Sequence, residues 1–356
     1  MTVGDLSTLL VWGSATALTI ALLAYTFALA RQAELSSRAE APEPVLAGAA
    51  TSAADGTASV AGVPGPPADG LPADDLPVDD LPSGDGAKAA GIARSTTLLG
   101  GVLLLAGIIA RGVAAGRSPT ANMYEFTLVG VLTAVAVLVF IERKRFIPFV
   151  GVIVLGISVL ALAFALLVFF IQADAVQPAL DSYWLVLHVG VAILATGVFT
   201  VAFAAAALQV LKDSRESGRS HLEQPWRRAD GLRRALHRWR VTGPAWAWLR
   251  TVPSPRALEA QSFRLNAIGF VGWTFALVGG SIWAEHAWGR YWGWDPKEVG
   301  TFVAWVVYAA YLHARTTRGW SGRRAAYFVF VGYAAVIANF TVVNLIPNGL
   351  HSYGGL

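Results

Sequence analysis

Eight apolar stretches separated by polar segments dominate the pattern of this chain. They cover residues 6–30, 96–115, 126–141, 146–171, 183–211, 263–283, 299–314 and 325–346. A helix needs about 20 apolar residues to cross a bilayer, and all eight stretches reach or approach that length, although two are short. We therefore predict an all-α, polytopic integral membrane protein with about eight transmembrane helices. The first stretch lacks a basic flank before it and is followed by Arg31, so we expect a retained span and not a cleaved signal peptide.

The polar segments divide the chain into five parts. We expect a first span in 1–30, a disordered cytoplasmic segment rich in Ala, Pro and Asp in 31–93, and four spans in 94–211. A basic cytoplasmic segment follows in 212–262, and we expect it to lie along an anionic lipid surface. The last three spans occupy 263–356, together with a tryptophan-rich segment at 283–298 and a C-terminal tail.

The basic residues predict the orientation. If the N-terminus lies outside, all but four of the 27 Lys and Arg residues fall on the inner side of the membrane. The four exceptions are Arg111, Arg117, Arg290 and Lys297. By the positive-inside rule, both termini and the segment 283–298 then face the outer side. Because the net charge of +4 comes from these loops, it is no argument for a nucleic-acid partner.

Composition narrows the chemistry. The chain is 55% hydrophobic and 14% charged, whereas a soluble domain is about a quarter charged. Cysteine is absent, which excludes disulfides, thiolate metal sites, Fe–S clusters and thiol nucleophiles. A haem bound here would therefore not be attached to this chain through cysteine thioethers.

The segment W-A-E-H-A-W-G-R-Y-W-G-W-D-P-K-E at 283–298 carries the densest cluster of aromatic residues. Its four tryptophans are Trp283, Trp288, Trp292 and Trp294. Such a surface suits a large planar ligand with a polar edge, and Trp288 and Trp292 would share one face if the segment were helical. The alternative is an interfacial belt, where Trp is common because it is amphipathic.

The end of this segment has a structural interpretation of its own. Asp295 at the N-cap, Pro296 at the first helical position and Glu298 at the third match the start of a helix. We expect capping to be the main task of Asp295 and Glu298, and a rigid start of the next helix would hold the tryptophans in place.

The histidines sort by depth. His188 lies near the outer end of the fifth span and His351 just beyond the eighth, so the two could flank the tryptophans as the paired ligands of a haem iron. His313 lies near the inner end of the seventh span without a mate at its depth, so a second ligand there would come from a partner or another copy. We expect His286 to be only polar, and we assign no role to the remaining two, His221 and His237.

Zinc is a weaker alternative for the same region. The carboxylates of Glu285, Asp295 and Glu298 could complete a site with the outer histidines. However, the sequence lacks the close histidine spacing that marks well-defined zinc sites.

The segment 283–298 closely resembles the WWD signature of haem-handling proteins in cytochrome c biogenesis. The following A-W-V-V-Y-A-A-Y-L-H-A-R resembles the next helix of the CcsA/ResC branch, and N-M-Y-E-F, S-Y-W-L-V-L-H and V-N-L-I-P-N-G-L-H-S-Y match it further. The resemblance covers about residue 94 to the C-terminus. It departs at His286, where Asn is expected, and the segments 31–93 and 212–262 look like additions.

The resemblance implies a function. It makes His188 and His351 outer ligands and His313 an intramembrane ligand of non-covalently held haem b, with Trp283, Trp288, Trp292, Trp294 and Asp295 around it. It implies a plasma-membrane protein that works with a ResB-type partner and attaches haem to Cys-X-X-Cys-His apocytochromes c. Arg290 and Lys297 are candidate partners of the haem propionates.

Three alternatives stay open. The first is a haem exporter or chaperone that forms no thioether bond. The second is a b-type redox cytochrome, and the third is a transporter that uses the tryptophans as a gate.

Overall fold

A computed structural model describes residues 2–39, 85–143, 146–174, 182–220, 222–225, 230–237 and 240–345. Its elements in these ranges are all helical, which confirms the predicted all-α class. They are α1 (Val3–Ala39), α2 (Asp85–Ala115), α3 (Met123–Ile141), α4 (Pro148–Leu167), the π-helix η2 (Leu185–Val189), α5 (Gly190–Glu216), α6 (Asp230–Leu236), the 3-10 helix η4 (Pro244–Thr251), α7 (Pro255–Trp288), α8 (Pro296–Thr317), α9 (Arg323–Phe340) and the 3-10 turn η5 (Val343–Leu345).

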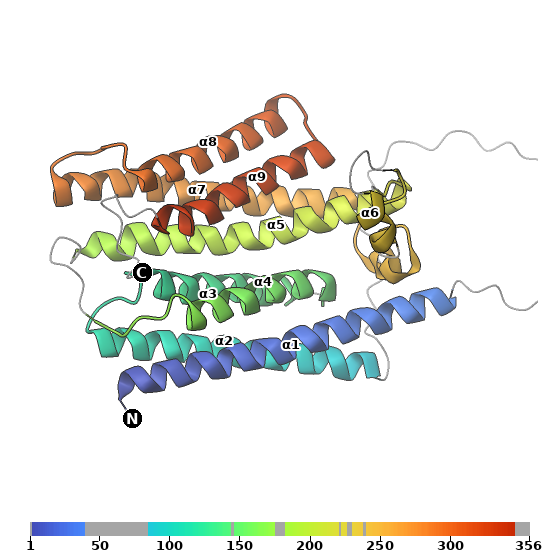
Figure 1. Cartoon of the computed structure of the whole chain (residues 1–356), viewed down its shortest axis with the longest axis horizontal. Helices are drawn as coiled ribbons and strands as arrows, with labels where there is room; N and C mark the ends of the chain where they lie inside the picture. The colour runs from blue at the N-terminus through green and yellow to red at the C-terminus, as the bar shows by residue number, and fades with distance from the viewer. Residues whose placement is uncertain are drawn as a thin grey trace, which may run out of the picture.

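Helix α5 joins two groups of packed helices. One group contains α1 to α4 and the other contains α7 to α9, and α5 contacts α3 and α4 as well as α7 and α9 (Figure 1). One face of α5 contributes Leu208 to the core of the first group. Its other face contributes Phe199, whose ring stacks on Tyr308 of α8 with 4.0 Å between ring centroids. Since both faces of α5 are apolar and occupied, the two groups share this helix as a common wall.

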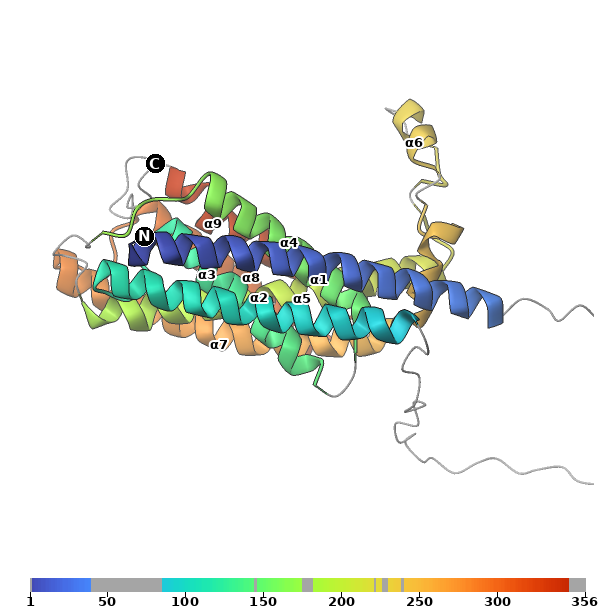
Figure 2. The ribbon, with the colours of Figure 1, turned by 90° about the horizontal axis from the view of Figure 1, so that it is seen from below.

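Six helices of the described residues are long and apolar enough to cross a membrane, judged by length and composition. They are α1, α2, α3, α4, η2 with α5, and α7. The other two predicted spans form α8 and α9, which pack against α7 and α5 in the same bundle (Figure 2). Both are less apolar, since α8 starts with Lys297 and Glu298 and α9 with two arginines. The number of eight and the outer position of both termini stay predictions.

Several helices are longer than the apolar stretches that predicted them. Helix α1 continues to Ala39 and α2 begins at Asp85, so helices take in both ends of the predicted disordered segment 31–93. Alanine favours a helix even where hydropathy is low, which explains the extension. The remainder of that segment, 40–84, lies outside the described residues. Helix α7 runs from Pro255 to Trp288, so it shortens the predicted loops 212–262 and 283–298.

Part of the basic segment is anchored on the bundle. The Lys212 ammonium donates a hydrogen bond to the Leu249 carbonyl at 2.8 Å, and Arg215 donates to the Val241 carbonyl at 2.8 Å. Leu249 is fully buried in the core beside α1. Helix α6, in contrast, buries none of its residues. These elements lie at one end of the bundle, and the connection from α7 to α8 lies at the other (Figure 1).

Candidate functional site

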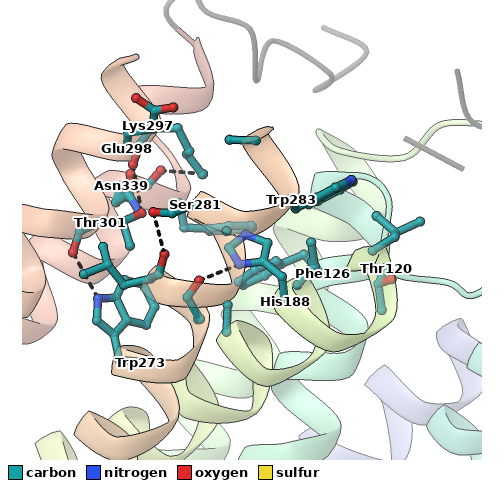
Figure 3. A pocket seen from close by; sticks show the side chains of 18 of the residues that line it. Thr120, Phe126, His188, Trp273, Ser281, Trp283, Lys297, Glu298, Thr301 and Asn339 are labelled. Carbon is teal, nitrogen blue, oxygen red and sulfur yellow. Dashed lines mark hydrogen bonds between the residues drawn. The ribbon is translucent and has the colours of Figure 1, made fainter. Parts of the chain in front are cut away.

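A cavity opens where the starts of α3 and α8 meet η2, the start of α5 and the ends of α7 and α9. Its unfilled space is about 1290 Å³, a volume that includes solvent at the open mouth. Cofactor sites are typically apolar clefts with a few placed polar groups, and this cavity follows that rule. Figure 3 shows His188 in this cavity together with the polar side chains of Lys297, Thr301 and Asn339. Its aromatic walls come from Phe126, Trp273, Trp283, Trp288, Tyr291, Trp292 and Phe340.

Among the described residues, His188 is the histidine that lines this cavity. Its Nδ1 lies 2.6 Å from the carbonyl oxygen of Ala276 on α7. A carbonyl only accepts hydrogen bonds, so Nδ1 carries the proton and the lone pair of the neutral ring resides on Nε2. Metal-binding histidines are commonly oriented by such a bond from the other ring nitrogen. The ring lies 5.8 Å from the Trp283 ring, with 58° between the planes.

The backbone around His188 is adapted to this ring. The residue belongs to the π-helix Leu185–Val189, and short π segments within helices occur frequently at functional sites. Across the gap, a Cβ atom added to Gly280 would lie 2.6 Å from the imidazole Cε1 and 2.9 Å from Nδ1. A glycine at 280 therefore gives the imidazole the space it occupies.

Three of the four tryptophans in the segment 283–298 line the cavity, and the fourth is exposed. Trp283 and Trp288 lie at the end of α7, which stops at Gly289 with a left-handed φ of 70°. Trp292 lies in the connection to α8, so Trp288 and Trp292 do not share a helical face, but both line the cavity. Trp294 is 75% exposed, has a positive φ of 59° and contacts Trp292 edge-to-face at 5.9 Å between ring centroids. It is not among the lining residues.

The capping prediction is confirmed. Asp295 accepts a hydrogen bond from the Lys297 backbone N–H at 2.9 Å, and Glu298 accepts one from the Asp295 N–H at 3.0 Å. Glu298 also accepts a bond from the Gly293 N–H at 2.8 Å. The buried carboxylate of Asp295 thus fixes the start of α8, and the cavity wall does not include it.

The motif N-M-Y-E-F builds the α3 side of the cavity. Asn122 caps α3 by accepting a bond from the Glu125 N–H at 2.9 Å, and Met123 and Phe126 line the cavity. Glu125 is fully buried between two cations: its carboxylate lies 3.0 Å from Nε of Arg111 and 2.7 Å from Nη1 of Arg117. This network holds the end of α2 to the start of α3.

A polar corner lies where α8 meets the end of α9. The Lys297 ammonium donates to the Asn339 carbonyl at 2.8 Å and to Oδ1 of Asn344 at 2.7 Å. Asn339 donates through Nδ2 to Thr301 Oγ1 at 2.9 Å, and Trp273 donates to the Thr301 carbonyl at 3.1 Å. All five side chains line the cavity. Sequence reasoning singled out only Lys297 among them, because the others are common residues within apolar stretches.

The other histidines lie elsewhere. His313 is exposed on α8, sixteen residues after Lys297 and so about 24 Å further along the helix at 1.5 Å per residue. His286 is also exposed, with its Nδ1 2.8 Å from the Ile282 carbonyl oxygen. His351 lies outside the described residues. Within the described ranges, no three His, Asp or Glu side chains converge on a possible metal position, so the zinc alternative has no support there.

The fold and the cavity together define a class: a multi-pass membrane protein whose helical bundle holds an aromatic cavity with an oriented histidine. The chain belongs to the cytochrome c assembly protein family, whose model matches residues 120–351. It is 34% identical to the cytochrome c biogenesis protein CcsA of Synechococcus sp. (strain CC9605) over 270 residues, which are 74% of this chain and 87% of that protein. The CcsA of Synechococcus sp. (strain CC9902) is 33% identical over 271 residues, with the same shares.

The fold also occurs in a larger protein. A solved structure of the cytochrome c haem lyase CcmF superposes with a TM-score of 0.55 at 15% sequence identity. The match covers 98% of this chain and 48% of the other, so the chain spans about half the length of CcmF. At this identity the likeness concerns the fold. The family-level resemblance drawn from the sequence is confirmed by the family model and the CcsA relatives.

Proposed function

We propose that the cavity binds haem and presents it at the outer face of the plasma membrane for attachment to Cys-X-X-Cys-His apocytochromes c. The observation that carries this proposal is the oriented His188 inside an aromatic cavity. Its Nε2 has the lone pair that an iron ligand needs, because Nδ1 is bound to the Ala276 carbonyl. Trp283, Trp288 and Trp292 offer flat apolar surfaces to the macrocycle.

His351 is the proposed second iron ligand. Asn344, at the end of the described chain, already lines the cavity, and His351 follows seven residues later. Seven extended residues span at most about 25 Å, so the chain has the length to return to the cavity mouth. Two imidazoles on opposite faces would hold the iron in a low-spin state until the histidine of the apocytochrome replaces one of them.

The contribution of this chain to bond formation is positional. A thioether forms when a cysteine S–H adds across a haem vinyl group: a C–S bond and a C–H bond form as the S–H bond and the vinyl π bond break. This chain contains no cysteine, so both thiols belong to the substrate. The aromatic walls exclude water and hold the macrocycle while the vinyl groups meet the thiols.

The ResB-type partner is proposed to pack against the exposed face of α8. His313 lies there in line with the exposed Phe302 and Val306, at spacings of four and seven residues along the helix. This exposure supports a ligand pair completed by a histidine of the partner. His313 would then bind haem on its way to the outer cavity.

The test is an optical spectrum of the full chain purified with its ResB-type partner, from cells that also express a Cys-X-X-Cys-His reporter. We expect a low-spin ferrous haem spectrum and covalent haem on the reporter. Haem in the protein without covalent reporter product would favour the exporter or chaperone alternative. A complete lack of haem would contradict the proposal and return the tryptophans to the role of a belt or gate.

Gly280→Ala should lower the haem content several-fold, because the added Cβ meets the imidazole of His188 at 2.6 Å. The ring must turn away, and the bond to the Ala276 carbonyl is lost with it. Haem per protein, measured by absorbance, checks this expectation. The matched control is Gly156→Ala on α4, where an added Cβ meets nothing within 4 Å. Equal haem content in the two variants would show that Gly280 does not position His188.

A further inference from the structure

We infer that Lys297 binds a carboxylate of the cavity ligand and thereby fixes which edge of the ligand enters the polar corner. This inference rests on the proposed function, in which the ligand is haem and the carboxylates are its propionates. It concerns a positioning contact away from the iron.

The hydrogen bonds of Lys297 support an anionic ligand. Its ammonium has three donors, and both acceptors found for it, the Asn339 carbonyl and the Asn344 amide oxygen, are neutral. Among the described residues, no carboxylate oxygen forms an ion pair with Lys297 within 4.0 Å. A half-buried charge is costly unless it is paired. A carboxylate brought by the ligand would supply an ion-pair partner within hydrogen-bonding distance.

The neighbouring carboxylates of Asp295 and Glu298 make backbone contacts, and of their oxygens only Oε1 of Glu298 is buried without a hydrogen-bond partner in the described part of the chain. Asp295 caps α8 by accepting from the Lys297 backbone N–H, and one oxygen of Glu298 accepts from two backbone N–H groups. These bonds hold the first turn of α8 in place and fix the Cα of Lys297. The two asparagine acceptors come from the end of α9 and from η5, so two consecutive elements hold the ammonium at the start of α8.

The shape of the cavity makes the contact directional. Apolar residues, the aromatic ones among them, form most of its wall, whereas Lys297, Thr301 and Asn339 gather where the start of α8 meets the end of α9 (Figure 3). Asn344 of η5 joins them through its hydrogen bond to the ammonium. A planar molecule with apolar faces and carboxylates on one edge fits this division, with that edge at the polar corner. The vinyl groups, which lie away from the carboxylates of haem, would then point away from the polar corner.

Arg290, the other cation suggested by the sequence, is placed differently. Its guanidinium packs over Gly293, where an added Cβ would fall on Nη1 itself, and it does not line the cavity. The structure therefore separates two cations that stand seven residues apart in one segment. Lys297 is the one that meets the ligand.

The experiment compares two probes on the full chain in detergent: haemin, and haemin dimethyl ester, whose carboxylates are masked. Wild type should bind haemin about tenfold more tightly than the dimethyl ester, because one charge-assisted hydrogen bond contributes a free energy of that order. Lys297→Met should bind both probes with the affinity that wild type has for the ester. Lys297→Arg should restore most of the preference. Lys88→Met is the matched control, since Lys88 is exposed on α2 and does not line the cavity, and it should keep the preference of wild type for haemin.

The outcomes are separable. Equal affinity of wild type for the two probes would overturn the inference without any variant, and so would a preference that survives in Lys297→Met. Binding of the ester by Lys297→Met reports that its cavity is folded. If no haem absorbance depends on His188, the proposed function itself is overturned. That result is distinct from an equal affinity for haemin and its ester, which overturns only the role of Lys297.

Discussion

His188→Ala should lower the haem content of the purified protein at least about tenfold and abolish covalent haem on a co-expressed reporter. The loss of an outer-shell partner of a metal ligand already costs about 10–100-fold in affinity, so the loss of the ligand should cost no less. Haem per protein is read from the absorbance, and covalent product from haem that stays on the reporter after denaturation. Because the variant leaves a space of imidazole size, added imidazole should restore part of the low-spin spectrum.

The matched control is His286→Ala. This histidine lies at the end of α7 together with Trp283 and Trp288, but its ring is exposed and the cavity wall does not include it. We expect normal haem content and normal reporter product. Full haem loading of His188→Ala, or a loss of equal size in His286→Ala, would remove His188 from its role as the ligand of this cavity.

Glu125→Gln should destabilise the protein by about 3–5 kcal/mol, the range for removing one partner of a buried ion pair. Arg111 is only 2% exposed and depends on this carboxylate, and Arg117 and the Ala121 N–H also donate to it. The variant leaves these donors with a neutral oxygen at best. We expect a clearly lower melting temperature in detergent.

Glu34→Gln serves as the control for this experiment. Glu34 pairs with Arg31 at 3.2 Å, but the two side chains are 43% and 41% exposed, and exposed ion pairs contribute only about 0–1 kcal/mol. Haem content should also fall in Glu125→Gln, because Met123 and Phe126 flank the buried carboxylate and line the cavity. If both variants have the same melting temperature, the Arg111–Glu125–Arg117 network does not stabilise this end of the bundle.

The fold of this chain also occurs as part of a larger protein. It matches about half of CcmF, although the sequences are only 15% identical. In this chain, the exposed His313 on α8 marks the face where we propose that a partner protein packs.

The sequence predicted most of the helices because membrane segments are long apolar runs, a signal that does not depend on distant contacts. It also predicted the start of α8 at Asp295, since a capping box is made by residues three positions apart. It placed helix ends less well. Helix α7 continues to Trp288, because helix formation does not require each residue to be apolar, and Gly289 ends it by taking a left-handed conformation.

The sequence by itself determined the all-helical class, the aromatic segment and the candidate histidines, because these follow from residue types and short spacings along the chain. Only the tertiary structure decided which of them meet. It brought His188 of η2 to Trp283 of α7, gave the ring its hydrogen bond to Ala276, and turned Trp294 outward while Trp292 faces the cavity. It also separated Lys297 from Arg290. Such contacts join residues tens of positions apart and depend on how whole helices pack, which local patterns do not encode.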